Sequence, residues 1–310
     1  MSLTDNCGRP LLNLRISITQ RCNIHCVYCH REGEVKRANC SAEKMTVQEI
    51  TRIAEIAVSV GIARIKLTGG EPLMRKDLPE IVSGIKAVQG LKDLSLTTNG
   101  LLLDGVAEQL HERGLKRVNI SLPSLNAETY HKLTGGNLQK ALAGVKAAVK
   151  TGFCPVKLNM VLLKDMNVDD VPNMIEYAKQ TGTILQLIEL DPINVTDRYY
   201  STYYKNLDDQ ERMLQEKAET IEKRPFMHNR IIYHLPNVTV EVVHPIENTD
   251  FCMHCTRMRV TSDGKLKPCL MRNDNLTDIL TPMRQGASDQ QIQQLFLQAN
   301  LLREPYNKSA

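Results

Sequence analysis

Cysteine is the residue type whose spacing in this chain most directly indicates chemistry. Among nine cysteines, two groups of three stand out, Cys22, Cys26 and Cys29, then Cys252, Cys255 and Cys269. The N-terminus, MSLTDNCGRP, has no apolar stretch typical of an export signal, so we expect a reducing compartment and free thiols. Clustered free thiols predict metal centres.

The first group has the spacing C-x3-C-x2-C and follows a β-like run over residues 12–19. Three thiolates on so short a loop can hold three corners of a cubane [4Fe–4S] cluster, which normally takes four cysteines. The fourth iron would then be open to bind a small molecule, as open zinc positions are. The alternative is a zinc site completed by His25 or His30. Tyr28 is either a core residue or a cover for an adenine ring.

The second group, C-x2-C-x13-C, also lacks a fourth cysteine, and a structural zinc completed by His244 or His254 is its alternative reading. Arg257 and Arg259 lie between its cysteines. In a strand their side chains would share one face, and paired guanidinium groups suit the oxygens of a polyphosphate. The alternative is a solvated basic edge strand.

Alternating strand and helix patterns position the first group. Strands are predicted over residues 12–19, 64–68, 93–97, 117–122, 156–162 and 184–190. Helices are predicted from Thr46, which forms a capping box with Glu49, and over residues 78–85, 103–113, 138–150 and 168–180. Glycines 61, 90, 114, 152 and 182 each follow a helix pattern, where a left-handed cap favours glycine.

These βα repeats predict parallel strands. Six units are too few for the eight of a closed TIM barrel, so we predict an open, partial (βα)6 barrel. Its active face should lie at the carboxyl ends of the strands. The second strand ends in Gly69-Gly70-Glu71-Pro72, where two glycines allow backbone to approach a ligand closely.

The pattern changes after Pro192, so we predict a barrel domain over residues 1–192 and an α+β extension over 193–310. The extension should contain a polar helix over residues 207–223, strands at 230–234 and 238–243, and a helix over 288–302. A hairpin is predicted between residues 257–261 and 265–270, with a Ser-Asp-Gly turn.

Composition excludes several classes of function. Hydrophobic residues make up 42% and charged residues 24% of the 310 residues, close to globular averages. A net charge of +4 is too small to mark a nucleic-acid binder, and no apolar run approaches the ~18–20 residues of a membrane helix. We therefore expect a cytoplasmic globular protein with no nucleic-acid or membrane partner.

The CxxxCxxC loop followed by a Gly-Gly-Glu-Pro turn resembles the radical S-adenosylmethionine (SAM) superfamily. The resemblance implies that the methionyl amino and carboxylate groups of SAM chelate the open iron. It also implies that an electron from the cluster cleaves SAM to methionine and a 5′-deoxyadenosyl radical, which abstracts hydrogen from the substrate.

Three further segments narrow the resemblance: Leu-Thr-Thr-Asn-Gly at 96–100, Val-Asn-Ile-Ser-Leu at 118–122 and the C-terminal C-x2-C-T-R-x-R. Together they are similar to the GTP 3′,8-cyclase family, which catalyses the first step of molybdenum-cofactor (molybdopterin) biosynthesis. The resemblance implies a second [4Fe–4S] cluster whose open iron binds guanine. The radical would take hydrogen from ribose C3′, and that carbon would then attack C8.

The product implied is (8S)-3′,8-cyclo-7,8-dihydroguanosine 5′-triphosphate, which cyclic pyranopterin monophosphate synthase would consume. The resemblance also implies an electron donor and a homodimer. It assigns no catalytic residue beyond the cluster ligands. It places SAM contacts at Tyr28, Gly70, Ser121 and Asp191, and GTP contacts at Arg15, Lys66, Thr97, Lys157, Arg257, Met258 and Arg259.

Four features depart from the family pattern. Pro123 stands where aspartate is common, and the sequence ends in Asn-Lys-Ser-Ala, not in the double glycine of many members. Lys66 stands where bacterial members usually have arginine, which keeps the charge but loses the bidentate fork. Asp191 stands where methionine is common. Two other functions stay open: a different two-cluster radical SAM enzyme such as a peptide maturase, which needs no arginine pair, and a non-catalytic Fe–S or zinc protein, which needs no Gly-Gly-Glu-Pro turn.

Overall fold

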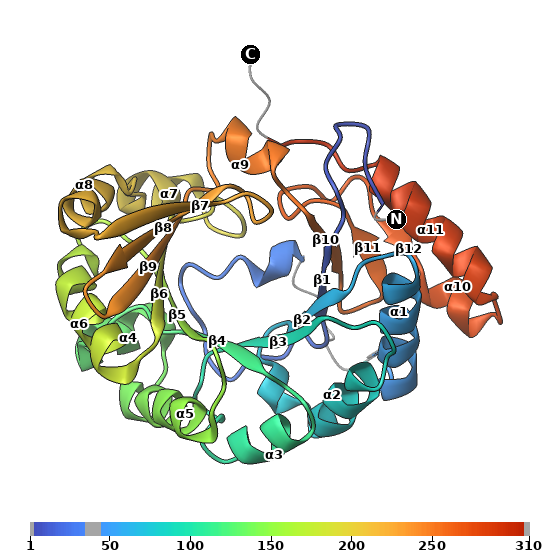
Figure 1. The fold of residues 1–310 in the computed structure, drawn as a ribbon, viewed down its shortest axis with the longest axis horizontal. Coiled ribbons are helices and arrows are strands. Elements are labelled where there is room, and N and C mark those ends of the chain that lie inside the picture. The colour runs from blue at the N-terminus through green and yellow to red at the C-terminus, as the bar shows by residue number, and fades with distance from the viewer. Residues whose placement is uncertain (1–2, 35–44, 307–310) are drawn as a thin grey trace.

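One curved sheet forms the centre of the computed structural model, which describes residues 3–34 and 45–306. Its twelve strands run in the order β12-β11-β10-β1-β2-β3-β4-β5-β6-β9-β8-β7. The sheet bends around an open interior, helices cover its outside, and the loop after β1 crosses the interior (Figure 1).

The six predicted barrel strands are confirmed. They are β1 (Asn13–Ser17), β2 (Arg64–Thr68), β3 (Asp93–Thr98), β4 (Arg117–Ser121), β5 (Val156–Val161) and β6 (Ile184–Ile188). Each pairs with the next in parallel, so their carboxyl ends meet at one rim, as in a partial TIM-like barrel.

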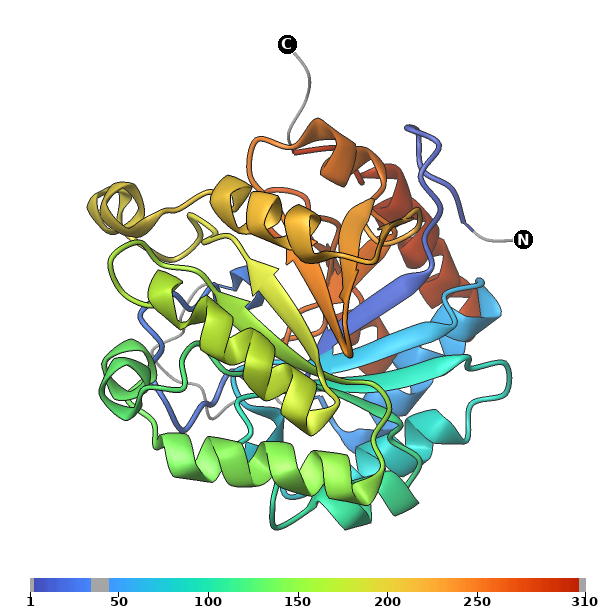
Figure 2. The same ribbon diagram turned by 60° about the vertical axis from the view of Figure 1, so that its left-hand side comes forward.

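Helices connect these strands on the outer face, as Figure 2 shows for the green and yellow elements. They are α1 (Val47–Ser59), α2 (Leu78–Lys86), α3 (Ala107–Glu112), α4 (Ala127–Thr134), α5 (Leu138–Thr151) and α6 (Val171–Thr181), with short turns η1 (Arg31–Gly33), η2 (Pro72–Met74) and η3 (Val168–Asp170). The capping box of Thr46 and Glu49 opens α1. The five predicted glycine caps have φ between 65° and 104°.

The remaining elements are strands that lengthen the sheet at both edges, together with the remaining helices. They are α7 (Asp197–Tyr203), α8 (Asp208–Lys217), β7 (Thr220–Arg224), β8 (Arg230–Leu235), β9 (Val238–Val243), α9 (Thr249–Met253), β10 (Arg257–Val260), β11 (Lys265–Lys267), β12 (Thr277–Asp278), α10 (Leu280–Arg284) and α11 (Asp289–Leu301). β9 pairs with β6 and β10 pairs with β1, both in parallel. The division at residue 192 stays a prediction.

Two sequence-based expectations were wrong in detail. The helix predicted over residues 207–223 ends at Lys217, and Thr220–Arg224 forms the edge strand β7, whose first four residues are exposed and show no apolar alternation. The helix predicted over 103–113 is only Ala107–Glu112. The hairpin of β10 and β11 and the final helix are confirmed.

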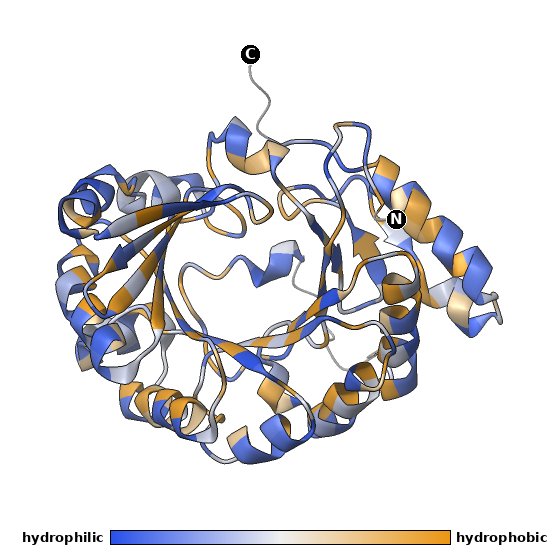
Figure 3. Cartoon of the chain, in the orientation of Figure 1, coloured by the Kyte–Doolittle hydropathy of each residue, from blue (hydrophilic) through white to orange (hydrophobic). Residues whose placement is uncertain are grey.

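Strand alternation separates the core from the interior. Leu14 and Ile16 of β1 are buried in the hydrophobic core beneath the outer helices, whereas Arg15 faces inward. The outer helices carry both hydrophobic and hydrophilic bands (Figure 3), as expected for helices with one face against a sheet. Within residues 3–34 and 45–306, no helix combines the length and apolar character that crossing a bilayer requires.

Candidate functional site

The inner face of the sheet and both cysteine loops enclose one cavity of about 710 Å³, a size typical of ligand pockets. With one exception, every site residue predicted from the sequence lines it: Arg15, Cys22, Cys26, Tyr28, Cys29, Lys66, Gly70, Thr97, Ser121, Lys157, Asp191, Cys252, Cys255, Arg257, Arg259 and Cys269. The exception is Met258, which is 0% exposed and packs in the core on the other face of β10. Only its backbone can therefore serve the cavity.

The first cysteine loop is anchored to the end of α4. The backbone N–H of His25 donates to Thr134 O at 3.0 Å, and that of Val27 donates to Leu133 O at 3.0 Å. Burial raises the pKa of the Cys26 thiol to about 12. Metal binding must therefore displace its proton.

The Gly-Gly-Glu-Pro turn packs against the backbone that leads into this loop. A Cβ on Gly70 would lie 2.3 Å from Arg21 O, and the N–H of Glu71 donates to the same oxygen at 2.7 Å. Gly70 lines the cavity, but the close approach that its missing side chain permits is to the protein's own chain. The sequence-based explanation, room for a ligand, is therefore incomplete.

Glu71 ties this turn to the neighbouring strand. Its carboxylate, 1% exposed, accepts hydrogen bonds from Thr98 Oγ1 and from the backbone N–H of Asn99, each at 2.7 Å. The Asn99 side chain in turn donates to Asn23 Oδ1 at 2.8 Å, beside Cys22. The turn therefore stabilises the first cysteine loop through Asn99.

Two buried arginines from opposite ends of the chain hold the second cysteine loop. Arg9 Nη1 donates to Cys252 O at 2.9 Å, and Arg303 Nη2 donates to Cys255 O. Asp5 pairs with both, at 2.8 Å to Arg9 and 3.4 Å to Arg303. Two guanidinium groups and one carboxylate leave a buried positive charge beside the thiols.

This charge favours thiolate formation in the second loop. Burial opposes ionisation of Cys255, but the guanidinium groups of Arg303 and Arg257 outweigh it, and the pKa of the thiol falls below its ordinary value. A cluster held by three thiolates is anionic overall, so these surroundings fit it.

A single zinc ion fits these loops less well. Over the described parts of the chain, no three His, Cys, Asp or Glu side chains gather tightly enough to hold one metal ion. A cubane spreads its thiolates over three irons and needs no such gathering. Although burial opposes it, hydrogen bonds to Glu189 and Glu211 raise the pKa of His244 to about 9, so two carboxylates already engage the side chain that would have to complete a zinc site.

Four cations form a wall of the cavity on three adjacent strands. Arg15 of β1 lies in register with Lys66 of β2 on one side and Arg259 of β10 on the other, and Arg257 lies two residues before Arg259. We call Arg15, Lys66, Arg257 and Arg259 the cationic wall. The predicted sharing of one face by Arg257 and Arg259 is confirmed.

The cationic wall carries more charge than its surroundings neutralise. Glu32 forms ion pairs with Arg259 and, at 3.4 Å, with Arg15. Among residues 3–34 and 45–306, the acceptor for Lys66 Nζ is an amide oxygen, Asn119 Oδ1, at 2.9 Å. Burial lowers the pKa of Arg15 to about 10 and those of Lys66 and Arg257 well below their ordinary values. An anionic ligand would therefore be bound favourably at the cationic wall.

Unpartnered polar atoms mark further contact points. Four cavity-lining atoms are buried and have no hydrogen-bond partner in the part of the chain that the structure describes: Arg15 Nε, Ser17 Oγ, Ser95 Oγ and Asp191 Oδ1. Unpaired buried polar groups are costly, so a polar ligand would be stabilised here. Burial also raises the pKa of Asp191.

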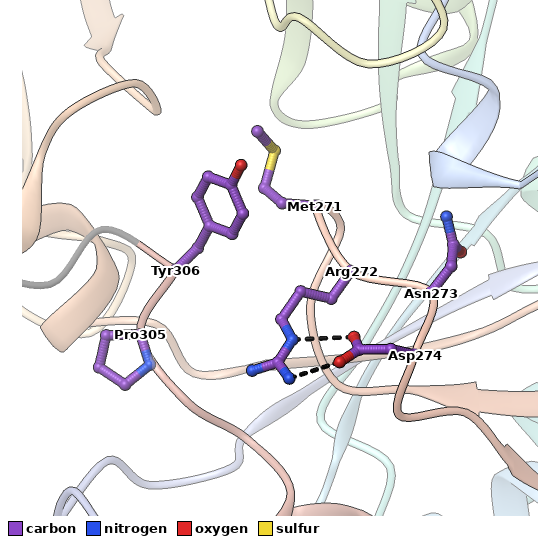
Figure 4. Close-up of a pocket in the computed structure, with 6 residues that line it drawn as sticks. All are labelled: Met271, Arg272, Asn273, Asp274, Pro305 and Tyr306. Carbon is purple, nitrogen blue, oxygen red and sulfur yellow. Dashed lines mark hydrogen bonds and ion pairs between the residues drawn. The ribbon is translucent and has the colours of Figure 1, made fainter.

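A shallow hollow lies next to the cavity on the side of Cys269. Figure 4 shows its lining, Met271, Arg272, Asn273, Asp274, Pro305 and Tyr306, with Arg272 paired to Asp274 at 2.7 Å. Met271 and Tyr306 line the main cavity as well. The hollow therefore borders the cavity mouth.

Several residues of the site were missed by the sequence reasoning: Glu32, Arg224 and Arg230, which line the cavity, and Glu241, which forms an ion pair with the lining residue Lys157. Glu241 carries a readable signal, because a lone carboxylate among the valines of β9 indicates an inward-facing charge. Glu32 lies in a loop and Arg224 and Arg230 flank a turn, where no periodicity marks them.

Two family profiles match the chain in succession. The profile described as Radical SAM superfamily matches residues 16–178, and the one described as Molybdenum Cofactor Synthesis C matches residues 183–309. The first match ends at residue 178 and the second begins at residue 183.

Solved structures share the fold at low sequence identity. SuiB of Streptococcus suis superposes with a TM-score of 0.63 at 16% identity, covering 96% of this chain and 67% of that one. The protein anSMEcpe with bound AdoMet gives a TM-score of 0.57 at 16% identity, covering 84% and 75%.

Curated relatives match over their whole length. A protein of Thermococcus kodakarensis is 48% identical, covering 99% of this chain and 100% of its own, and one of Methanocaldococcus jannaschii is 43% identical, covering 99% of both. Each bears the name "Probable GTP 3',8-cyclase". This chain belongs to the radical SAM superfamily and, within it, to the GTP 3′,8-cyclase family.

Proposed function

We propose that this protein cyclises GTP to (8S)-3′,8-cyclo-7,8-dihydroguanosine 5′-triphosphate, the first step of molybdenum-cofactor biosynthesis. The observation that carries the proposal is the cavity itself, in which two three-cysteine loops flank a wall of buried, under-compensated cations. Family membership supports the same reaction.

The cofactors are two [4Fe–4S] clusters and SAM. Cys22, Cys26 and Cys29 hold the first cluster, and Tyr28, Gly70, Ser121 and Asp191 contact SAM. When bound, this cluster and SAM supply the radical that takes hydrogen from C3′ of the ribose.

Cys252, Cys255 and Cys269 would hold the second cluster, which would supply an iron to bind the guanine of GTP. Arg15, Lys66, Arg257, Arg259 and Lys157 bind the triphosphate by charge-assisted hydrogen bonds. Thr97 and the backbone of Met258 contribute further GTP contacts. Fixing the nucleotide at both ends orients the ribose between them.

The wider setting follows from this reaction. An electron donor supplies the first cluster, cyclic pyranopterin monophosphate synthase consumes the product, and the protein acts as a homodimer in the cytoplasm. Residues 1–192 and 193–310 form the barrel domain and the extension that carries the second cluster.

Anaerobic incubation of the reconstituted protein with SAM, dithionite and GTP tests the proposal. We expect an isomer of GTP, separable by chromatography, together with 5′-deoxyadenosine. Cys269→Ala should abolish the isomer while the first cluster continues to cleave SAM. Formation of 5′-deoxyadenosine by the wild type with GTP recovered unchanged would exclude the cyclase reaction.

A further inference from the structure

The hairpin of β7 and β8 brings two additional arginines to the cavity. Arg224 ends β7, Arg230 begins β8, and the two are paired in register. Both line the cavity, although they come from the extension and lie outside both cysteine motifs.

Glu241 is shared by three cations at this place. It forms an ion pair with Lys157, and its oxygens lie 3.5 Å from Arg224 Nη1 and 3.9 Å from Arg230 Nη1. Gln186 Nε2 also donates to this carboxylate. One negative charge against three positive charges leaves a net excess of two.

Arg230 is the least satisfied member of this group. Its side chain is only 10% exposed, and its Nε is buried without a hydrogen-bond partner among the described residues. Burial lowers the pKa of its guanidinium group, although Glu241 opposes the shift. A buried, unpaired cationic donor is stabilised strongly by an anion that reaches it.

Arg230 also lies close to the cationic wall. Arg230, Arg15 and Arg257 line the same cavity, so their like charges repel one another across it. A single anionic group could neutralise one set of cations only. A chain of linked phosphates carries enough charge to satisfy both sets at once.

We propose that Arg230, with Lys157 and Arg224, forms a second phosphate-binding subsite, which grips the polyphosphate of the substrate from the side opposite the cationic wall. This inference rests on the proposed function, because that function supplies the nucleoside triphosphate. It assigns to the β7–β8 hairpin a direct part in substrate binding.

The substitution Arg230→Gln tests the subsite. Binding of GTP and of guanosine would be measured on anaerobically reconstituted protein without SAM, so that no turnover occurs. We expect GTP affinity to fall about ten- to a hundred-fold, as for loss of one charge-assisted contact, with guanosine affinity unchanged and iron content intact. An equal loss for both ligands, or no loss, would overturn the inference.

Two further variants separate binding from folding. Arg224 is more exposed, at 36%, so Arg224→Gln should fold normally and weaken GTP binding in the same direction by a smaller factor. Arg212, 72% exposed on α8, provides a matched control, and Arg212→Gln should leave both affinities unchanged. If Arg224→Gln and Arg212→Gln behave alike and Arg230→Gln fails to fold, the subsite is refuted.

Failure of the subsite and failure of the proposed function give different results. If the wild type forms the GTP isomer while Arg230→Gln binds GTP normally, only the subsite is wrong. If the wild type binds GTP, loses affinity on Arg230→Gln and yet forms no isomer, the subsite stands and the cyclase reaction is wrong.

Discussion

Among single residues, Arg257 shows most clearly that the charges lining the cavity need an anionic ligand to compensate them. Its guanidinium group is buried beside Arg15 and Arg259, and no carboxylate pairs with it among residues 3–34 and 45–306. Arg259, by contrast, has Glu32 as a partner. The two arginines that look equivalent in the sequence therefore differ in their surroundings.

Arg257→Ala should have opposite effects on binding and on stability. GTP affinity should fall about ten- to a hundred-fold, because a charge-assisted contact contributes roughly 1.5–3 kcal/mol. The melting temperature of the ligand-free protein should rise, because an unpaired buried charge is removed. Calorimetric binding and thermal unfolding check this, with Arg212→Ala as the control. A lower melting temperature with unchanged GTP affinity would contradict it.

Lys157 predicts a pH dependence of GTP binding. Burial lowers its pKa from 10.5 to about 8, although Glu241 opposes the shift. Above pH 8 the free protein therefore loses this positive charge, and GTP affinity should decline. Lys157→Arg should abolish the decline. Binding titrations on either side of this pH test it, and identical pH profiles for the two proteins would refute the assignment.

The same shift fixes the sign of a stability effect. The unfolded chain still binds the proton between pH 8 and 10.5, whereas the folded chain does not. The contribution of Lys157 to folding therefore becomes more favourable as the pH rises through this window.

At the scale of elements, the barrel was predictable because local signals agreed with one another. Strands such as Arg64–Thr68 alternate polar and apolar residues, and a glycine in a left-handed conformation follows the preceding helix. Strand β7 was not predictable, because its exposed residues Thr220–Lys223 carry no alternation and only pairing with β8 makes them a strand. A local sequence pattern indicates where a helix or strand lies, but not which other element it pairs with.

The Gly-Gly-Glu-Pro turn gives a prediction at this scale. Gly70→Ala places a Cβ against Arg21 O, which precedes Cys22, so the first cysteine loop must shift. We expect reconstituted protein to lose iron from the first cluster, up to about half of the roughly eight irons of two cubanes. Gly105, with nothing within 4 Å of an added Cβ, provides the control Gly105→Ala. Full iron content in Gly70→Ala would show that the turn tolerates a side chain.

At the scale of the whole molecule, segments far apart in sequence meet at the second cysteine loop. β1 pairs with β10, and Arg9 and Arg303 approach the loop from the two ends of the chain. The sequence pattern predicted a metal centre at these cysteines and the hairpin beside them. It did not predict this arrangement, because no local pattern specifies contacts between such distant segments. For the same reason, the sequence could not predict that Lys157, Arg224 and Arg230 share Glu241.

Arg303→Leu tests whether the contacts of Arg9 and Arg303 with the second cysteine loop stabilise the molecule. It removes a buried donor to Cys255 O and leaves Asp5 with Arg9 alone, so we expect a loss of roughly 1.5–3 kcal/mol in stability. Arg52, paired with Asp289 at the surface, offers the control Arg52→Leu, for which a much smaller loss is expected. Anaerobic unfolding in denaturant measures both. Equal losses of stability in the two variants would mean that the contacts of Arg303 contribute no more than a surface ion pair.

The most direct test of the central claim is the fate of the hydrogen at C3′ of GTP. The reconstituted protein would be incubated anaerobically with SAM, dithionite and GTP carrying deuterium at C3′. We predict that the deuterium appears in 5′-deoxyadenosine and is missing from the cyclised isomer of GTP. Unlabelled 5′-deoxyadenosine, with the deuterium still in the nucleotide, would contradict the account.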